Sequence, residues 1–511
     1  MIIPSPYRRS AGVASLAAAV AIAIGLVAAV HYDRLGLTLT HYDARGHLIV
    51  ARRIIDSITP GWQQIGAVWL PLPHLLNMLP VQIDVFYRNG WSGSAISVVS
   101  FAIAATAIAS IVRTITASNA ASLAALAVFV LNPNVLYLQS TPMTEPLLIA
   151  LTTVAVALGV QEFSDAARPL RSRAGDGIAV AARPLECRTL LGVVFALACL
   201  TRYEAWPMTA LALTSIFWVA WRQGAGPRAA LQTVAEIAVY PALAIAGFTV
   251  FSRVVVGGWF VSSDFFVPEN RALGDVTSAI REVGWGAATL SATPLAWIGT
   301  IGIGAALAIG LVERRRAHAV LVVSLVAMAA VPLAAFYRGH PFRIRYMVPL
   351  LAAEAIGCGL AAGSIRRVRL IASAIVIAVA AAVLRPLDAA APMVVEAQWD
   401  RPNLAARSEV TRCIGRLRPG AKIMASMGSL GHYMQEASAD GFGIRDFLHE
   451  GNGDIWLAAI DRPRPFADWL LIEEKAEGGD MLARIAREHP DFLHGYSRVC
   501  EGAGLALYRR D

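Results

Sequence analysis

A short polar stretch, residues 41–47 with the sequence HYDARGH, combines one aspartate with two histidines and an arginine. It follows the first long apolar run, residues 11–30, by about ten positions, so it lies near the membrane boundary if that run spans a bilayer. Charged side chains at a lipid boundary are costly unless they serve a site or contact a lipid headgroup. Asp43 and its neighbours are therefore the first candidates for chemistry in this chain.

Residues 42–57 have apolar and basic side chains at helical spacing, which predicts an amphipathic helix lying in the membrane interface. On such a helix Asp43 and His47 stand one turn apart on one face. A divalent cation could bridge the pair, or a hydrogen bond between them could orient the carboxylate, and both interpretations stay open. A third alternative is that Asp43 only caps the helix.

Polar residues also interrupt two later apolar segments. Glu145 begins the expected span 145–162, and it is either a ligand for sugar or acceptor hydroxyls or a first-turn acid favoured by the helix dipole. Arg202 and Glu204 flank Tyr203 between two apolar runs. Arg202 either binds phosphate with Glu204 as its partner, or the two form an interfacial ion pair.

A cluster of four potential cations precedes the tenth expected span, and it comprises Arg338, His340, Arg343 and Arg345. Basic residues on the outer side of a membrane run against the positive-inside trend, so they need a reason. A clamp on a lipid phosphate is one reason, and anchoring to anionic headgroups is the alternative.

The composition is that of an integral membrane protein. Of 511 residues, 56% are hydrophobic and 16% are charged, which is too apolar and too poor in charge for an ordinary soluble enzyme. The net charge of +8 comes from arginines in short loops, which indicates membrane orientation and not nucleic acid. The five cysteines have no CxxC or metal-site spacing; Cys413 and Cys500 are either one disulfide or two buried thiols.

Apolar runs long enough to cross a bilayer predict about eleven transmembrane helices. The first resembles a signal peptide, but its apolar core is too long, so we interpret it as an uncleaved span. The expected spans are residues 11–30, 93–112, 117–136, 145–162, 188–203, 205–221, 231–251, 286–311, 318–336, 346–363 and 370–385.

With these spans, six arginine-containing segments fall on one side, which the positive-inside rule assigns to the cytoplasm. The N-terminus is then cytoplasmic, and residues 31–92 form the first outer loop. The many alanine, arginine and glycine residues are typical of a GC-rich bacterial genome, so the expected location is a bacterial inner (plasma) membrane.

Residues 386–511 have a soluble composition, with strand-like pieces at 421–426 and 469–472 and a helical stretch at 479–489. They predict a small C-terminal α/β domain, which the odd number of spans places on the extracytoplasmic side. Residues 1–385 are then the membrane module.

Taken together, these stretches resemble the membrane glycosyltransferases of the GT-C superfamily. Within it the chain is most similar to the protein O-mannosyltransferase and aminoarabinose-transferase-like group, family 39. The resemblance runs from about His31 to Pro349 and rests on the sequence segments HYDARGHLIVARRIID, WLPLPHLL, STPMTEPLL, LTRYEAW and PFRIRYMVPL. Asp43 is followed by Ala44 and not by the second acidic residue typical of protein mannosyltransferases, which weakens the case for a protein acceptor.

The resemblance implies a GT-C fold in which an acidic residue of the first outer loop faces the sugar of a polyprenyl-phosphate donor. Asp43 is then the catalytic base. Residues expected to bind substrate are His47, Glu145, Arg202, Tyr203, Glu204, His340, Arg343, Arg345 and Tyr346.

The implied reaction transfers a hexose or pentose, with inversion, to an acceptor hydroxyl on a glycolipid, polysaccharide or protein. The expected partners are the polyprenyl-phosphate sugar, membrane lipids and this acceptor. Three alternatives stay open: a lipid-linked-sugar transporter, a ligase for a diphosphate-linked oligosaccharide, and a non-enzymatic envelope assembly protein.

Overall fold

The computed structural model describes residues 6–166, 183–259, 270–399, 401–417, 420–475 and 479–511. Contacts within the chain divide it into two compact units. The first unit comprises Met1–Leu35, Ile96–Ser140 and Thr144–Glu396, and the second comprises Gly36–Ala95, Thr141–Met143 and Ala397–Asp511. The second unit therefore combines the expected first outer loop with the C-terminal segment.

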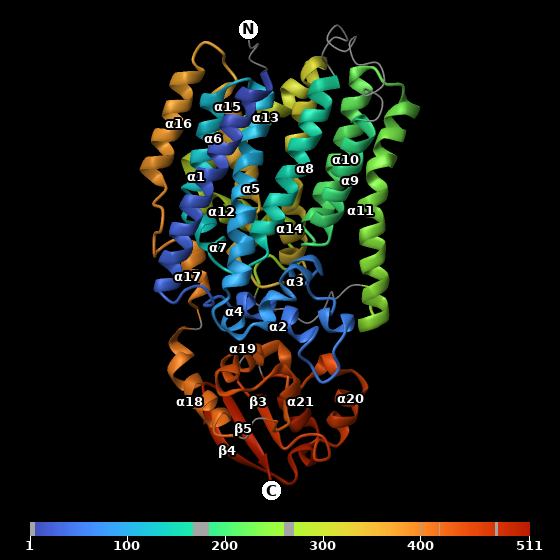
Figure 1. Ribbon diagram of the computed structural model, residues 1–511, viewed down its shortest axis with the longest axis vertical. Helices are drawn as coiled ribbons and strands as arrows, with labels where there is room; N and C mark the ends of the chain where they lie inside the picture. Colours follow the sequence, from blue (N-terminus) through green and yellow to red (C-terminus); the bar gives the residue numbers. More distant parts are fainter. Residues whose placement is uncertain (1–5, 167–182, 260–269, 400, 418–419, 476–478) are drawn as a thin grey trace. The chain divides into compact units, whose positions relative to one another are not determined.

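The first unit is built from long apolar helices that run side by side as a bundle (Figure 1). The helices that lie wholly or mainly in it are α1 (Pro6–Arg34), α5 (Trp91–Thr116), α6 (Asn119–Val130), α7 (Pro133–Leu138), α8 (Glu145–Ala166), α9 (Arg183–Cys199), α10 (Ala205–Gln223), α11 (Pro227–Val256), α12 (Val276–Ser291), α13 (Thr293–Val312), η4 (Arg314–Ala329), α14 (Ala330–Tyr337), η5 (Ile344–Met347), α15 (Leu350–Gly363), α16 (Arg369–Val383) and α17 (Pro392–Ala397).

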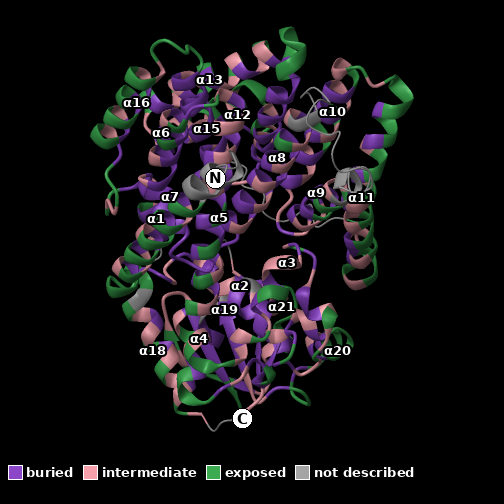
Figure 2. Ribbon diagram, turned by 45° about the horizontal axis from the view of Figure 1, so that its top comes forward, coloured by how far each residue is buried: buried purple, intermediate pink, exposed green. Residues whose placement is uncertain are grey.

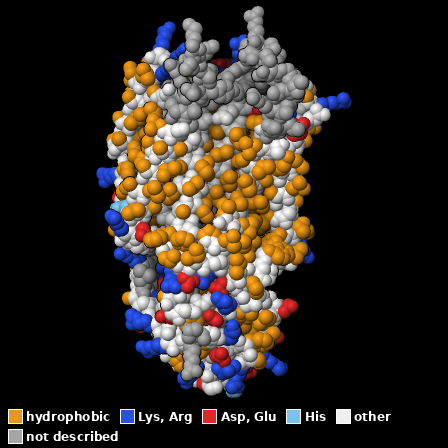
Figure 3. Space-filling model, viewed as in Figure 1, with side chains coloured by type: hydrophobic (Ala, Val, Ile, Leu, Met, Phe, Trp, Pro, Cys, Tyr) orange, Lys and Arg blue, Asp and Glu red, His pale blue; other side chains and the backbone are white. Residues whose placement is uncertain are grey.

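Six helical segments among the described residues are long and apolar enough to cross a membrane, and four shorter apolar helices accompany them. Large apolar side chains also cover the outside of the bundle (Figure 3). Leu243 of α11 and Leu370 of α16, for example, are 67% and 70% exposed. An apolar surface of this extent indicates contact with lipid, so the chain is a multi-pass membrane protein. The number of about eleven spans stays a prediction.

Two of the expected spans are wrong in their bounds because a proline starts a new helix inside each. The run 286–311 is divided between α12 and α13 at Ala292, which has φ 68°, and Pro294 occupies the first turn of α13. The run 117–136 is divided between α6 and α7, where Pro133 begins α7. Proline has no N–H to donate and is favoured in the first turn of a helix.

The interior of the bundle is closely packed. Figure 2 shows α5 and α8 largely buried, whereas exposed residues follow α11. Helices α13 and α15 approach so closely that a Cβ on Gly302 would lie 1.8 Å from the carbonyl oxygen of Gly357. Only glycine allows this contact between the two backbones, as is usual where helices associate in membranes.

The second unit contains short helices from residues 36–95 and an α/β segment from residues 397–511. The first group is α2 (Tyr42–Arg53), η1 (Trp62–Ile65), α3 (Leu72–Asn77), η2 (Pro80–Gln82) and α4 (Asp84–Asn89). The second group is η6 (Arg401–Asn403), α18 (Leu404–Gly415), β1 (Ile423–Ala425), α19 (Met427–Ala437), η7 (Ser438–Asp440), η8 (Ile444–Asp446), β2 (Phe447–Leu448), η9 (Glu450–Asn452), α20 (Asp454–Asp461), β3 (Trp469–Glu473), α21 (Met481–Glu488), η11 (Pro490–Leu493), β4 (Tyr496–Gly502) and β5 (Leu505–Arg510).

A five-stranded mixed sheet with the order β2-β1-β3-β5-β4 forms the centre of the α/β segment. Strand β1 pairs in parallel with β2 and β3, whereas β5 runs antiparallel to β3 and β4. Successive side chains of β1 point to opposite faces, so Ile423 and Ala425 pack with residues of α18 and α19 while Met424 packs with residues of α20 and α21. Both faces of the sheet are therefore covered by helices.

The expected C-terminal α/β segment is confirmed. Strands β1 and β3 and helix α21 lie at the three places where the sequence pattern predicts them. Of the two alternatives for the cysteines, the structure has the disulfide, Cys413–Cys500, which links α18 to β4.

Candidate functional site

The first candidate residue, Asp43, lies in the first turn of α2 and is half-buried. The residue that caps the helix is His41, whose Nδ1 accepts a hydrogen bond of 3.2 Å from the Asp43 backbone N–H. The alternative that Asp43 itself is the N-cap is therefore wrong. The first turn of α2, where Asp43 lies, is the positive end of the helix dipole.

His47, one turn further along α2, forms a buried pair with His74 of α3. His74 donates its Nδ1–H to the carbonyl oxygen of Leu70, so its Nε2 accepts from His47 Nδ1 at 3.1 Å. Burial, together with the charge of Arg53, lowers the pKa of His74 to about 3, so this ring is neutral at physiological pH. The interaction fixes the orientation of the His47 ring.

The tryptophan at the start of WLPLPHLL packs directly on α2. A Cβ on Gly46 would lie 2.7 Å from Cη2 of Trp69, so no larger residue fits there. The centroids of the Trp69 and His47 rings are 4.2 Å apart. Two of the sequence segments that carry the resemblance therefore contact each other in the folded unit: HYDARGHLIVARRIID and WLPLPHLL.

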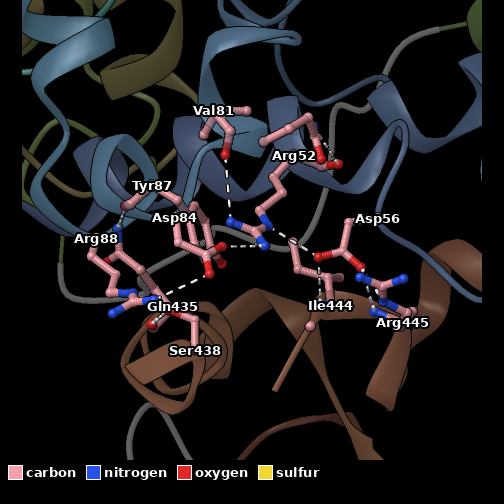
Figure 4. Close-up of polar contacts among 12 residues, drawn as sticks. Arg52, Asp56, Val81, Asp84, Tyr87, Arg88, Gln435, Ser438, Ile444 and Arg445 are labelled. Carbon is pink, nitrogen blue, oxygen red and sulfur yellow. Dashed lines mark hydrogen bonds and ion pairs between the residues drawn. The ribbon is translucent and has the colours of Figure 1, made fainter. Parts of the chain in front are cut away.

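The far end of α2 is held by the C-terminal segment of the same unit (Figure 4). Asp56, just beyond α2, accepts from Nε of Arg52 at 3.0 Å and pairs with Nε of Arg445 at 3.1 Å. It also accepts from the backbone N–H groups of Ile444 and Arg445 at 3.1 and 3.3 Å. Nearer the start of α2, Arg45 pairs with Glu436 at 2.7 Å. The helix that carries Asp43 is thus bonded to α19 and to the loop after it.

In the first unit, Glu145, Arg202, Glu204 and Arg345 meet in one buried cluster. Glu145, at the start of α8, has no exposed surface, and its Oε1 lies 2.9 Å from Nη1 of Arg202 and 3.9 Å from Nη1 of Arg345. Arg202 also contacts Glu204, with Nη2 2.7 Å from Oε1, and donates to the hydroxyl of Thr144 at 3.0 Å. Three segments that carry the resemblance, STPMTEPLL, LTRYEAW and PFRIRYMVPL, each supply charge to this cluster.

The charges of this cluster balance one another. Burial lowers the pKa of Arg202, but Glu145 and Glu204 more than offset this effect, so the pKa lies above its ordinary value. The pairing with Glu204 agrees with both interpretations of Arg202, because a paired guanidinium still has further N–H groups to offer a ligand.

In the loop before α15, the charge of Arg343 acts on the nearby Glu396 carboxylate without a close ion pair. The guanidinium of Arg343 is half-buried and makes no hydrogen bond or ion pair with any residue in the described ranges. Nearby, Glu396 of α17 accepts from the backbone N–H of Ile344 at 2.7 Å. Burial raises the pKa of Glu396. Arg343 and the more exposed Arg338 are therefore the guanidinium groups before α15 that can bind an added anion.

The remaining candidates have aromatic contacts. Tyr346 lies with its ring centroid 5.4 Å from that of His340, and its hydroxyl is 3.4 Å from His340 Nε2. Tyr203 packs edge-on against Trp206 at 5.2 Å and also against Phe248. Tyr203 thus lies beside apolar rings, although its sequence neighbours belong to the charged cluster.

Asp43 and His47 belong to the second unit, and the other candidates belong to the first. Sequence reasoning did not select His74, Asp56 or Glu396, because their partners are remote along the chain. No group of three or more His, Cys, Asp or Glu side chains that could hold a metal ion occurs among the residues that the structure describes. The sequence leaves a divalent cation as one of two interpretations of Asp43 and His47, and the described residues hold no cluster of this kind to support it.

Neither protein-family models nor curated proteins gave a match to this chain. Solved structures did match this chain. ArnT from Cupriavidus metallidurans bound to undecaprenyl phosphate aligns with 97% of this chain and 97% of its own, at 14% identity and a TM-score of 0.57. The same protein in the apo state gives 98% of each chain, 12% identity and a TM-score of 0.58.

The archaeal oligosaccharyltransferase AglB from Archaeoglobus fulgidus, in complex with an inhibitory peptide and a dolichol-phosphate, is also similar. The match covers 89% of this chain and 69% of that one, at 10% identity and a TM-score of 0.51. These proteins belong to the GT-C superfamily, so the expected GT-C fold is confirmed.

Proposed function

We propose that this protein is an integral membrane glycosyltransferase that moves a monosaccharide from a polyprenyl-phosphate donor to a hydroxyl of an envelope acceptor. The observation that carries the proposal is the shared fold over nearly the whole length of ArnT, a protein solved with undecaprenyl phosphate bound. AglB, solved with a dolichol-phosphate, supports the same class of lipid carrier.

Asp43 is the proposed general base. The acceptor oxygen attacks the anomeric carbon, the bond from that carbon to the phosphate oxygen breaks, and the polyprenyl phosphate leaves with the bonding electrons. Asp43 takes the proton of the acceptor hydroxyl, since a carboxylate within hydrogen-bond reach is suited to that step. One displacement of this kind inverts the anomeric configuration.

The arginines before α15 are the proposed stabilisers of the leaving phosphate. Charge develops on the phosphate as the glycosidic bond breaks, and the planar guanidinium forms paired hydrogen bonds with such oxygens. Arg343 has its guanidinium available, whereas Arg345 lies near Glu145 in the buried cluster. In this proposal Glu145 holds Arg202 and Arg345 in place, Arg202 offers its remaining N–H groups to the sugar, and His340 and Tyr346 border the phosphate.

The Cys413–Cys500 disulfide supports an oxidising compartment for the C-terminal segment, because such bonds are rare in the cytosol. We therefore place this segment on the extracytoplasmic face of a bacterial inner membrane and the N-terminus in the cytoplasm. A divalent cation near Asp43 and His47 is part of the proposal, and treatment with a chelator tests whether transfer requires this cation.

The experiment is a release assay on the full chain reconstituted in vesicles. Polyprenyl-phosphate hexoses and pentoses serve as donors, a cell-envelope extract serves as acceptor, and the readout is free polyprenyl phosphate. Asp43→Asn is expected to lower the rate by roughly 10²- to 10⁴-fold, the usual contribution of a general base. Asp33→Asn is the matched control, because Asp33 is an exposed acid ten residues earlier in the chain.

Equal release by wild type and Asp43→Asn would remove Asp43 from the mechanism. Release only from a diphosphate-linked oligosaccharide would favour the ligase. Movement of the lipid-linked sugar across the vesicle membrane without release would favour the transporter.

A further inference from the structure

A polar pocket of about 400 Å³ lies in the second unit, at the end of α2 remote from Asp43. Its walls come from two parts of the chain: Arg52, Gln82 and Asp84 on one side, and Ser438, Arg445 and the backbone of residues 441–443 on the other. Its volume is within the range of about 300–1,000 Å³ that small-molecule sites occupy. No role for it follows from the transfer chemistry proposed for Asp43.

The charged groups that line the pocket, Arg52, Asp84 and Arg445, form an alternating chain with the adjacent Arg88 and Asp56 (Figure 4). Asp84 contacts Arg88 at 3.1 Å and Arg52 at 2.8 Å, Arg52 contacts Asp56 at 3.0 Å, and Asp56 contacts Arg445 at 3.1 Å. Every guanidinium therefore already has a carboxylate beside it. Three arginines share two aspartates, which leaves a surplus of only one positive charge, and a dense anion such as phosphate would have to compete with both carboxylates. The pocket therefore favours a ligand without net charge.

The pocket still offers both donors and acceptors. Arg445, whose side chain is 69% exposed, uses Nε on Asp56, and its terminal N–H groups remain for a ligand. The Asp84 carboxylate is 51% exposed. Gln82 donates its amide N–H groups to backbone carbonyls, which leaves Oε1 as an acceptor, and Ser438 donates to the Gln435 carbonyl, which leaves its lone pairs.

Neighbouring hydroxyl groups match this arrangement, because each hydroxyl both donates and accepts while guanidinium and carboxylate groups bind in pairs. We propose that the pocket binds a sugar residue of the acceptor, so that the acceptor is a glycolipid or polysaccharide. The inference rests on the proposed transferase function. It assigns the acceptor class, which the transfer chemistry leaves undefined.

Helix α2 relates this pocket to the proposed base. Arg52 follows Asp43 by nine residues, which corresponds to roughly 14 Å along a helix that rises 1.5 Å per residue. The sugar in the pocket is then a part of the acceptor remote from the reacting hydroxyl. Binding of such a part positions the reacting group, so acceptors that lack it lose turnover as well as affinity.

Two measurements on the full chain in lipid nanodiscs test the proposal. The first is binding of a panel of neutral di- to tetrasaccharides of hexoses, N-acetylhexosamines and pentoses, together with their phosphorylated counterparts. Wild type is expected to bind a neutral member with little dependence on salt, and Arg445→Ala is expected to weaken that binding roughly tenfold or more. Arg412→Ala, which removes an exposed arginine of the same unit outside the pocket, is expected to change nothing.

Asp84→Ala is the second pocket variant, because its exposed carboxylate can be removed with little effect on folding. It is expected to weaken the same saccharide. Three results would each overturn the proposal: wild type binds no neutral saccharide, it binds only phosphorylated members with a steep dependence on salt, or both pocket variants bind as well as wild type.

The second measurement is the transfer rate against acceptor concentration. Arg445→Ala is expected to raise the acceptor KM roughly tenfold and leave the donor KM unchanged, whereas Asp43→Asn lowers kcat. Loss of transfer by every variant and by wild type would contradict the proposed function, but saccharide binding to the pocket would still be measurable. An unchanged acceptor KM in an active Arg445→Ala enzyme would refute the pocket alone.

Discussion

Asp56→Ala is expected to release the end of α2 from the C-terminal segment. The Asp56 side chain is only 4% exposed, and its carboxylate accepts from Arg52 Nε, Arg445 Nε and two backbone N–H groups, those of Ile444 and Arg445. The substitution removes all four interactions at once. It also leaves Arg52, whose side chain is 8% exposed, with Asp84 as its remaining carboxylate in the described structure.

The magnitude follows from the burial of the pair. Arg52 keeps Asp84 as a partner, so the loss comes from its hydrogen bond to Asp56, about 1.5–3 kcal/mol, and from the two backbone N–H groups that lose their acceptor, about 1–3 kcal/mol each. The contribution of Arg445 is small, since its side chain is 69% exposed and solvent screens the contact. We therefore expect the free energy of local opening around Asp56 to fall by about 3.5–5 kcal/mol, the lower end of the summed range because neighbouring interactions are not additive, with most of it from Arg52 and the two backbone donors.

Hydrogen exchange followed by mass spectrometry measures this opening in the full chain. Peptides that cover residues 50–58 and 441–448 are expected to exchange faster by roughly two to three orders of magnitude, because each 1.4 kcal/mol is a factor of ten. Peptides from β3 and β5 are expected to exchange as in wild type, since the hydrogen bonds of Asp56 go to Arg52, Ile444 and Arg445 and not to these strands. Turnover is expected to fall with unchanged donor KM, because α2 no longer holds Asp43 in a fixed position.

Asp84→Ala is the matched control, because Asp84 pairs with the same arginine but is 51% exposed. An exposed pair contributes about 0–1 kcal/mol, so exchange should rise by less than about tenfold. Equal, small effects of Asp56→Ala and Asp84→Ala would refute the reasoning that Asp56 anchors α2.

Three further predictions concern other parts of the molecule. Glu145→Gln removes the buried carboxylate that contacts Arg202, but Arg202 keeps Glu204, so thermal unfolding should show a loss of about 1.5–3 kcal/mol. The exposed Glu236→Gln should cost less than about 1 kcal/mol, and equal effects would contradict the cluster. Cys413→Ser opens the disulfide and should lower the stability of the C-terminal segment by about 2–5 kcal/mol, and wild type treated with reductant should match it. The pKa of His74 is about 3 in the folded unit and about 6.5 in its ordinary state. Between these values the unfolded chain binds a proton that the folded unit does not, so stability should fall as pH drops from about 6.5 towards 3. His74→Asn should flatten that dependence, and an unchanged slope would show that this ring does not contribute.

The class of protein and the places of its main elements could be predicted from the sequence. Long apolar runs specify membrane helices because burying a helix in hydrocarbon needs only side-chain hydrophobicity and length. Short apolar runs located β1 and β3, and helical spacing located α2, because these patterns are local. The expected span 286–311 was wrong because hydrophobicity is continuous across the break between α12 and α13. Pro294, in the first turn of α13, is the local signal of that break.

The partners of the candidate residues were decided only by the tertiary structure. His47 contacts His74 across 27 residues, and Asp56 accepts from the backbone of Ile444 across 388 residues. Helical and strand periodicity report which face of an element is apolar, but they carry no information about which remote group meets a polar side chain. The partner of a buried charge depends on how whole elements pack. Burying a charge is costly unless packing places an opposite charge or a hydrogen-bond partner beside it. The sequence alone therefore determined that Asp43 begins a helix beside a membrane span, and packing alone decided that the C-terminal segment holds that helix.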